Sequence, residues 1–207
     1  MFTGITRGTF PVVAVERAPD LLRFVVDVGT YGEGLEVGAS VSIDGVCQTV
    51  VALDGGRATF EAIRETLDKT TLSELEVGAT VSAERSARVG DEIGGHEVSG
   101  HVTGTGTIVE AAKAGHEVDL CIGVPAKWMK YILHKGFVAL DGSSLTVGER
   151  SDEGWFWVHL IPETLRITNL GRKPVGARVN VELDPKTVAI VDTVERVLAA
   201  RGVARGA

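Results

Sequence analysis

The sequence predicts a mainly β protein, in which one β-rich module occurs twice and is followed by a single helix. Three observations support this prediction. Blocks of sequence recur in the same order in both halves of the chain. Short runs rich in Val, Ile and Thr alternate with Gly, Asp and Asn, as strands alternate with turns. The last part of the chain instead carries apolar residues at helical spacing.

The repeat is the strongest of these signals, and its partners lie 96 to 98 positions apart. The matching blocks are TGITRGT (3–9) with SGHVTGT (99–105), VSIDGVCQTV (41–50) with VALDGSSLTV (138–147), ETLDKTTL (65–72) with ETLRITNL (163–170), and VGATVSAE (77–84) with VGARVNVE (175–182). Several blocks in one order indicate a duplication. The alternative to two working halves is a structural duplication with one working half.

Within each repeat, the expected strands are short runs between turn residues. The clearest runs are residues 22–28, 39–45 and 58–63 in the first half, and 117–124, 137–142 and 155–161 in the second. Asp-Gly pairs at 44–45, 54–55 and 141–142 are strong hairpin signals. This spacing indicates a small barrel or a sandwich in each half. A barrel is favoured because closure removes exposed sheet edges.

Helices are predicted outside these strands. The segment 125–133 begins with Pro and has helical spacing, and the repeat suggests a short helix near 30–36, although two glycines weaken it. The tail is clearer, because Asp184 is a good N-cap, Pro185 follows it and Gly202 ends the helix. One face of this helix is apolar: Ile190, Val191, Val194, Val197 and Leu198. That face packs either on the chain's own barrel or on symmetry-related copies.

Composition limits the class of protein. The chain has 207 residues, enough for two small domains that each bury a modest core. Its formal net charge of −7 argues against a nucleic-acid surface, which needs a basic patch or stripe. No apolar stretch approaches the length of a membrane span, and no signal-peptide pattern is present. Two cysteines, Cys47 and Cys121, favour a reducing compartment, so we expect a cytoplasmic protein.

Two matched pairs of small polar residues follow the Asp-Gly turns. Side chains alternate along a strand, so Cys47 shares a face with Thr49, and Ser144 shares a face with Thr146. Small polar side chains need hydrogen-bond partners when buried. In one repeat a locally satisfied hydroxyl pair would be the better interpretation. Two matched copies favour two ligand sites, and therefore an enzyme that handles two copies of one small molecule.

The segment GGHEVSGHVTGTG at 94–106 carries two histidines. His96 and His101 are five positions apart, so they miss the HExxH spacing of zinc proteases, and the glycines disfavour a helix. We expect no metal site. His101 aligns with Ile5 of the first repeat, so one half has a titratable side chain where the other is apolar. That difference suits a reaction with one donor and one acceptor molecule; the alternative is a structural histidine.

Several motifs together resemble the riboflavin synthase family in its trimeric α-type form. They are MFTGI, DGVCQTV, ETLDKTTL, GGHEVSGHV, MKYILHKGFVALDGSSLTVG, HLIPETLRITNLG and VDTVERVLAAR, in order from Met1 to about Arg201. The resemblance implies two tandem six-stranded Greek-key β-barrels and a C-terminal helix. We therefore expect an N-terminal barrel over 1–95, a C-terminal barrel over 96–184, and a trimerisation helix with its tail over 185–207.

The resemblance also implies an activity. Members of this family are transferases that dismutate two molecules of 6,7-dimethyl-8-ribityllumazine. A four-carbon unit passes from one molecule to the other, giving riboflavin and 5-amino-6-(ribitylamino)pyrimidinedione without a metal or redox cofactor. The resemblance further implies a homotrimer, whose productive site joins the N-terminal barrel of one subunit to the C-terminal barrel of its neighbour. Association with lumazine synthase stays open.

The resemblance assigns substrate-binding residues to two sites. The first-site residues are Gly4, Ile5, Thr6, Cys47, Gln48, Thr49, Glu61, Ala62, Ile63, Arg64, Glu65 and Thr66. The second-site residues are Gly100, His101, Val102, Lys135, Ser144, Leu145, Thr146, His159, Leu160, Ile161, Pro162, Glu163 and Thr164. Two positions depart from the family pattern: Gln48, where an apolar residue is usual, and Thr103, where Asp is common. Strand alternation points Gln48 away from Cys47.

The resemblance also suggests roles for individual residues. We assign His101 to proton transfer, because a histidine with a pKa of about 6.5 suits the acidic 7-methyl group of the ligand. Ser144 and Thr146 hydrogen-bond the ring and stabilise the anion. Cys47 contacts the acceptor molecule, by a hydrogen bond or by addition to its ring. Asp184 is expected to complete the site.

Two other classes of protein are possible alternatives. A non-catalytic lumazine- or flavin-binding protein has the same duplicated barrel, but it has no need of both polar sets or of a trimer helix. A flavin-dependent reductase would need a nicotinamide domain, for which the chain has no room.

Overall fold

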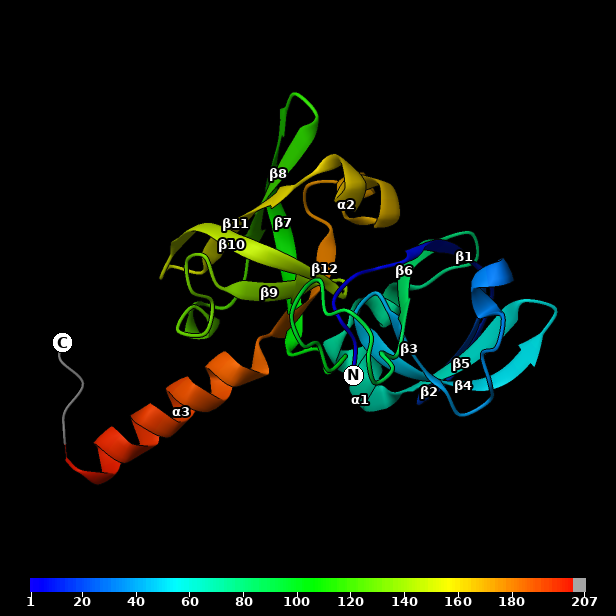
Figure 1. The fold of residues 1–207 in the computed structure, drawn as a ribbon, viewed down its shortest axis with the longest axis horizontal. Helices are drawn as coiled ribbons and strands as arrows, with labels where there is room; N and C mark the ends of the chain where they lie inside the picture. The colour runs from blue at the N-terminus through cyan, green and yellow to red at the C-terminus, as the bar shows by residue number, and fades with distance from the viewer. Residues whose placement is uncertain (203–207) are drawn as a thin grey trace.

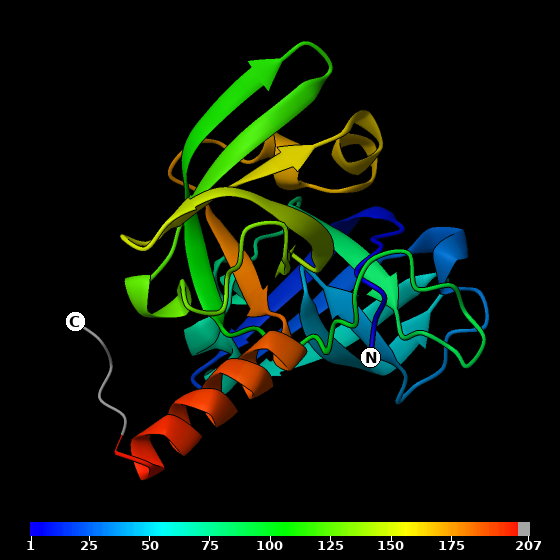
Figure 2. The ribbon, with the colours of Figure 1, turned by 60° about the vertical axis from the view of Figure 1, so that its left-hand side comes forward.

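The computed structural model describes residues 1–202, which fold into two β-barrels and one projecting helix (Figures 1 and 2). The first barrel contains β1 (Gly8–Ala18), β2 (Leu21–Asp27), β3 (Ser40–Ile43), β4 (Val46–Asp54), β5 (Arg57–Ile63) and β6 (Thr80–Arg85). These strands close in the order β1-β2-β5-β4-β3-β6, with antiparallel neighbours. Because β2 pairs with β5 instead of β3, the connection is of the Greek-key kind.

The second barrel repeats this circuit. It contains β7 (Gly104–Ala114), β8 (Glu117–Gly123), β9 (Phe137–Leu140), β10 (Ser143–Ser151), β11 (Trp155–Leu160) and β12 (Arg178–Leu183). Around the barrel the order is β7-β8-β11-β10-β9-β12, and it also closes. The predicted mainly β fold with two six-stranded barrels and a C-terminal helix is confirmed. The boundaries after residues 95 and 184 fall outside the strands and stay a proposal.

Alternation along each strand fills the barrels with apolar side chains. In β2, Leu22, Phe24 and Val26 are buried, whereas Arg23 between them is exposed. Phe24 stacks on Phe60 of β5 with ring centroids 5.4 Å apart. The second barrel has the same construction, with a separate core. Each barrel has its own core because every strand turns one face toward the inside of its barrel.

Short helices follow the same strand of each repeat. Helix α1 (Arg64–Lys69) follows β5, and α2 (Pro162–Ile167) follows β11. Neither helix was predicted from the sequence, although both lie in matched blocks. The predicted helix at 125–133 is wrong, because only Ala126–Trp128 forms a 3-10 helix, with turns after it. Met129 and Ile132, which follow this short helix, are nevertheless buried in the second core. Near 30–36, the structure has a 3-10 helix at Gly29–Gly32.

Helix α3 (Pro185–Ala200) projects from the second barrel (Figures 1 and 2). The middle of the helix is held by Lys130, whose Nζ lies 2.6 Å from a carboxylate oxygen of Glu195, and by Tyr131, whose hydroxyl donates to Asp192 at 2.5 Å. Val191 is half-buried, and the other apolar residues of the predicted face are exposed: Ile190, Val194, Val197 and Leu198. Within residues 1–202, no helix is long and apolar enough to cross a membrane. The last part of the predicted tail, 203–207, lies outside the described residues.

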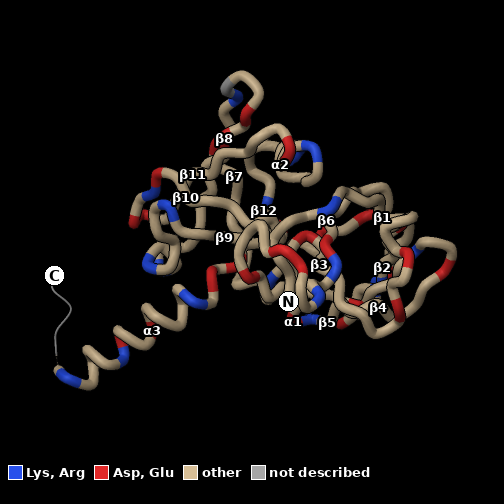
Figure 3. The backbone as a smooth tube through the Cα atoms, in the orientation of Figure 1, with Lys and Arg blue, Asp and Glu red and all other residues tan. Residues whose placement is uncertain are grey.

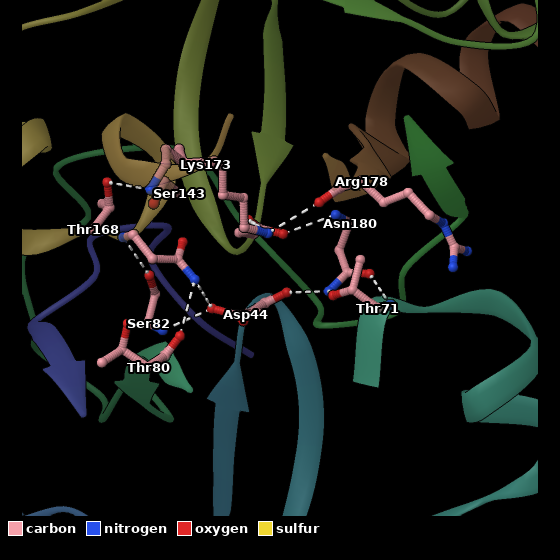
Figure 4. Close-up of polar contacts among 12 residues, drawn as sticks. Asp44, Thr71, Thr80, Ser82, Ser143, Thr168, Lys173, Arg178 and Asn180 are labelled. Carbon is pink, nitrogen blue, oxygen red and sulfur yellow. Dashed lines mark hydrogen bonds and ion pairs between the residues drawn. The ribbon is translucent and has the colours of Figure 1, made fainter. Parts of the chain in front are cut away.

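Buried polar contacts join the two barrels (Figure 4). The carboxylate of Asp44, in the turn between β3 and β4, accepts hydrogen bonds from the backbone N–H of Ser82 at 2.7 Å and from Nδ2 of Asn169 at 2.9 Å. Asn180 of β12 donates to the Asp44 carbonyl at 2.7 Å and accepts from the Thr71 N–H at 2.8 Å. Each side chain therefore ties one repeat to the other.

The region where these polar contacts join the two barrels, which we call the seam, contains two buried aspartates, Asp44 and Asp141, and Lys173. Asp141, the repeat partner of Asp44, accepts from the Asn180 N–H at 2.8 Å, and its second oxygen lies 2.5 Å from Lys173 Nζ. Burial, together with the charge of Asp141, raises the pKa of Asp44 to about 7 against the opposing effect of Lys173. The first repeat has Leu75 where the second has Lys173, so the first repeat supplies no matching lysine, and the charge of Lys173 acts on both Asp44 and Asp141.

Charged residues of both signs are interspersed over both barrels, as Figure 3 shows. This distribution agrees with the formal net charge of −7 and with the absence of a basic stripe in the sequence. The ligand sites must therefore be sought in local features of the barrels.

Candidate functional site

Strands β4 and β10 present their small polar side chains on the outer face of each barrel. Val46 and Val50 point into the first core, while Cys47 is half-buried and Thr49 is exposed. In β10, Ser144 is half-buried and Thr146 is exposed, and Val147 belongs to the core. The shared face predicted for each pair is confirmed. Each pair is open to a ligand from outside its barrel.

Four predicted contact residues point the other way. Ala62, Leu145 and Leu160 are buried in the barrel cores, and Gln48 is 5% exposed, with Nε2 donating to the Cys47 carbonyl at 3.0 Å. Their side chains are therefore unavailable to a ligand, because strand alternation directs them inward. The expectation that Gln48 faces away from Cys47 is confirmed. Outward neighbours such as Glu61 and Ile63 remain accessible.

The segments that lead into the two repeats cross over. Phe2 and Val98 form a short antiparallel bridge, with N–H to carbonyl distances of 2.7 and 3.1 Å. Beyond the bridge, the Gly4 carbonyl accepts from the Ser144 N–H at 2.8 Å in the second barrel. The Gly100 carbonyl accepts from the Cys47 N–H at 2.9 Å in the first barrel.

This crossing corrects the predicted grouping of site residues. Gly4, Ile5 and Thr6 were assigned with Cys47, but the structure places Gly4 and Thr6 against the second barrel, where Thr6 Oγ1 lies 2.9 Å from Ser143 Oγ. Conversely, Gly100, His101 and Val102 lie beside Cys47 in the first barrel. Alignment of the repeats could not reveal this, because the exchange is a tertiary event that leaves the order of the blocks unchanged.

The first half-site is a cavity of about 250 Å³ beside β4 and α1. Residues from both repeats line it: Cys47, Thr66, Lys69, Gly100, His101 and Val102. Lys69 forms an ion pair with Glu65 at 2.8 Å, and both residues also line the cavity. The lining thus combines a thiol, a hydroxyl, an ammonium and an imidazole, which suits a polar planar ligand.

The second half-site lies on the outer face of β10, around Ser144 and Thr146. His96 is the histidine that reaches it, with Nδ1 2.6 Å from Ser144 Oγ. The His96 ring stacks on Phe137 at 5.2 Å, and Phe137 is paired across the strands with Thr146. From the sequence, His96 was considered only as a metal ligand, and its contact with Ser144 was not predicted. The signal was weak, because His96 has no counterpart in the first repeat.

Burial sets the protonation of His96. The side chain is 7% exposed, and Nε2 is buried without a hydrogen-bond partner among residues 1–202. Burial lowers the pKa of His96, and the negative charges of Asp184 and Glu182 only partly oppose this effect. The neutral ring can therefore act on Ser144 Oγ as an acceptor or a donor, according to its tautomer.

The remaining second-site residues follow β11 and precede β9. His159 lies at the outer end of β11, with Nδ1 2.6 Å from an Asp119 oxygen, and the chain then enters α2 through Pro162. Lys135 is exposed, and its N–H donates to the Val147 carbonyl at 2.9 Å. Thr164 accepts through its carbonyl from Thr168 within the α2 region. The assignment of these residues to the second half-site stays a prediction.

Asp184 lies at the start of α3 and caps it. One oxygen accepts from the Thr187 N–H at 2.9 Å and from the Thr187 hydroxyl at 2.6 Å, and the other accepts from the Lys186 N–H at 3.4 Å. Burial works to raise the pKa of Asp184, but these hydrogen bonds outweigh it and lower the pKa. The predicted N-cap is confirmed, and capping accounts for every hydrogen bond of this carboxylate that the described structure shows.

A second cavity of about 480 Å³ adjoins the first half-site through His101. It lies between the second barrel and the start of α3, and its apolar lining includes Trp128, Tyr131, Leu183 and Val188. His101 therefore faces two cavities. In residues 1–202, no group of three or more His, Cys, Asp or Glu side chains is placed to hold a metal ion.

Comparisons with known proteins agree with this geometry. The family model described as "Lumazine binding domain" matches residues 3–86 and 99–184. Riboflavin synthase of Escherichia coli (strain K12) is 48% identical over 203 residues, covering 97% of this chain and 95% of that protein. Riboflavin synthase of Chlamydia trachomatis is 42% identical, covering 95% of this chain and 96% of the relative. That of Mycobacterium bovis is 38% identical, covering 98% of this chain and 100% of the relative.

Among solved structures, the crystal structure of LumP complexed with riboflavin has a TM-score of 0.83 at 26% identity. The alignment covers 89% of this chain and 100% of that one. LumP complexed with 6,7-dimethyl-8-(1'-D-ribityl) lumazine has a TM-score of 0.80 at 25% identity, with 89% and 99% coverage. The chain belongs to the riboflavin synthase family and carries the lumazine-binding domain twice.

Proposed function

We infer that the protein is an enzyme, a riboflavin synthase of the transferase class, which dismutates two molecules of 6,7-dimethyl-8-ribityllumazine. One molecule donates a four-carbon unit and leaves as 5-amino-6-(ribitylamino)pyrimidinedione, and the other accepts the unit and becomes riboflavin. The observation that carries this inference is the pair of half-sites, each with a polar pair on the outer face of a barrel.

The two half-sites differ in ways that suit a donor and an acceptor. The first has Cys47 and Thr49, with His101 in the same cavity, and the second has Ser144 and Thr146. His101 moves the proton of the acidic 7-methyl group, and Cys47 contacts the acceptor ring. Ser144 and Thr146 donate hydrogen bonds to the ring and stabilise the carbanion. Holding two rings face to face supplies further rate enhancement through proximity.

The productive site is formed between subunits. The first half-site of one chain, with its His101, faces the second half-site of the neighbouring chain, with its Ser144 and Thr146. A homotrimer held by α3 would bring them together. The exposed apolar residues Ile190 and Val194 support this assembly, since 65% and 51% of their surfaces are exposed in the single chain.

The assembly can be tested by sedimentation. Val194→Lys should convert the trimer to monomers and abolish turnover, because the charge would be buried in the helix contact. Ala199→Lys, on the other side of the helix, should leave the trimer intact. A monomeric wild-type protein with full turnover would overturn the proposal. Co-sedimentation with lumazine synthase tests the association that the resemblance leaves open.

A second candidate function comes from LumP, whose solved structures hold riboflavin or the lumazine. A non-catalytic protein with this fold would bind the ligand without converting it. The polar residues Ser144 and Thr146 of the second half-site, and the apolar face of α3, favour the enzyme, because a carrier needs neither a second site nor an assembly.

Mixing the purified protein with 6,7-dimethyl-8-ribityllumazine alone separates the two functions. Riboflavin should form at half the rate at which the lumazine is lost, as followed by absorbance without any added cofactor. Tight binding without formation of riboflavin would assign the protein to the carrier class.

A further inference from the structure

Two buried glutamates occupy matched positions on the last strand of each barrel. Glu84 is on β6 and Glu182 is on β12, and each is 4% exposed. A buried carboxylate is unfavourable unless hydrogen-bond donors surround it. The donors around both glutamates come from the crossing segments that lead into the two repeats.

Each glutamate accepts three hydrogen bonds. Glu84 receives the Thr3 N–H at 2.7 Å, the Thr3 hydroxyl at 2.7 Å and the Gly4 N–H at 3.1 Å. Glu182 receives the Ser99 N–H at 2.7 Å, the Ser99 hydroxyl at 2.7 Å and the Gly100 N–H at 2.9 Å. We call each glutamate with its three donors a clamp. The two clamps are equivalent, because in both of them Oε1 accepts two hydrogen bonds and Oε2 accepts one. Hydrogen bonds to a charged acceptor are among the stronger ones in proteins.

The glycine held by each clamp touches the other barrel. The Gly4 N–H binds Glu84 of the first barrel while the Gly4 carbonyl binds the Ser144 N–H of the second. The Gly100 N–H binds Glu182 of the second barrel while its carbonyl binds the Cys47 N–H of the first. Both glycines have positive φ, +74° and +81°, and a Cβ on either would lie 2.6 Å from the Cβ of Ser144 or of Cys47.

We propose that Glu84 and Glu182 are positioning residues that act crosswise: Glu84, on the first barrel, sets the geometry of the second half-site, and Glu182, on the second barrel, sets that of the first. Glu182 is linked to the first half-site through Gly100, because the next residues, His101 and Val102, line the cavity beside Cys47. Only the identity of the ligand rests on the proposed function.

A purely structural role makes a different prediction. If the glutamates only stabilised the fold, removing either one would loosen both half-sites alike, or would loosen the barrel on which the glutamate sits. Crosswise action requires that each substitution disturb the half-site of the opposite barrel and spare its own. Thiol chemistry can distinguish these outcomes, because Cys47 lies directly under Gly100, and the other cysteine, Cys121, is buried.

The first experiment uses the alkylation rate of Cys47 by iodoacetamide in the full-length protein. Glu182→Gln should raise this rate roughly tenfold, the scale of one lost buried hydrogen bond, because Gln places an amide N–H against a backbone donor. Glu84→Gln should leave it within about twofold. Glu149→Gln, at an exposed position of β10, is the matched control and should change nothing.

The second experiment moves the reporter to the other barrel. In a Cys47→Ser, Ser144→Cys background, Glu84→Gln should raise the alkylation rate of the new thiol roughly tenfold, and Glu182→Gln should not. Equal changes in both backgrounds, or changes confined to the glutamate's own barrel, would overturn the proposal. If the glutamine variants fail to fold, Thr3→Val and Ser99→Ala remove one donor from each clamp and should give the same crosswise pattern.

Adding 6,7-dimethyl-8-ribityllumazine to these assays separates this inference from the proposed function. In the wild-type background, bound lumazine should slow the alkylation of Cys47. If it does not, the proposed ligand at the first half-site is wrong, while the crosswise pattern in the ligand-free protein still stands or falls by itself. With the lumazine as substrate, the glutamine variants should raise KM, while their melting temperatures should stay close to that of the wild-type protein.

Discussion

His96 and His101 lie five positions apart, yet they serve different barrels. His101 lines the cavity beside Cys47, and its backbone N–H donates to the Ser99 hydroxyl at 3.1 Å. His96 is buried against Phe137 and reaches Ser144 Oγ at 2.6 Å. The titratable group next to Ser144 within one chain is therefore His96. In the proposed trimer, His101 would approach Ser144 from the neighbouring subunit.

We predict that His96→Phe lowers kcat/KM by roughly tenfold or more. The phenyl ring keeps the stacking on Phe137 but leaves Ser144 without its partner, a loss of about 1–3 kcal/mol, and each 1.4 kcal/mol is a factor of ten. Steady-state kinetics with the lumazine would measure this loss. His116→Phe, at an exposed hairpin, is the control and should retain wild-type kinetics. Unchanged kinetics in the His96 variant would show that Ser144 needs no partner.

At the scale of single elements, the start of α3 was predicted correctly from its N-cap residue, Asp184, but a second predicted role of this residue is not visible in the structure. Asp184 was expected both to cap the helix and to complete the site. In the structure, the Asp184 carboxylate accepts hydrogen bonds from the N–H groups of Lys186 and Thr187 and from the Thr187 hydroxyl. The capping role is visible, and the chemical role stays a prediction.

Two substitutions distinguish these roles of Asp184. Asp184→Ala should lower the free energy of unfolding by about 1 kcal/mol, the usual loss for a removed N-cap. Asp184→Asn should retain stability, because asparagine caps as well as aspartate. Urea denaturation measures both effects. If the asparagine variant keeps its stability but loses turnover, the carboxylate takes part in the chemistry; full turnover would restrict Asp184 to capping.

At the scale of the whole molecule, the contact between the barrels depends on the half-buried ammonium group of Lys173. Asp44 and Asp141 are both buried, and Lys173 is the side chain whose Nζ lies 2.5 Å from Asp141. Burial and the charge of Asp141 raise the pKa of Asp44 to about 7, well above its ordinary value. Between about pH 4 and pH 7 the folded state therefore binds more protons than the unfolded state, and the free energy of unfolding falls as the pH rises through this range.

We predict that Lys173→Met lowers the free energy of unfolding by about 3–5 kcal/mol at pH 8, the range for a broken buried pair. The loss should be smaller at pH 5, where protonation of Asp44 removes part of the uncompensated charge. Urea denaturation at the two pH values measures the difference. Lys186→Met, which breaks an exposed pair with Glu97, should cost less than about 1 kcal/mol at either pH. An equal loss at both pH values for Lys173→Met would contradict the electrostatic explanation.

The sequence by itself determined the features that depend on local patterns. Alternation within VSIDGVCQTV and VALDGSSLTV identified the inward and outward faces of β4 and β10, because side chains in a strand alternate. The repeat identified two β-rich modules, which the family resemblance described as six-stranded barrels, and Asp184-Pro185 identified the start of α3. Each of these signals lies within a few residues of the feature that it predicts.

Only the tertiary structure decided which residues share a half-site. The crossing at Phe2 and Val98 places Gly4 on the second barrel and Gly100 on the first, and it brings His96 to Ser144. The partners in these contacts lie 48 to 140 residues apart in the chain, so local periodicity carries no record of them. They form because each barrel leaves a buried backbone N–H beside the segment of the other, and buried polar groups require partners.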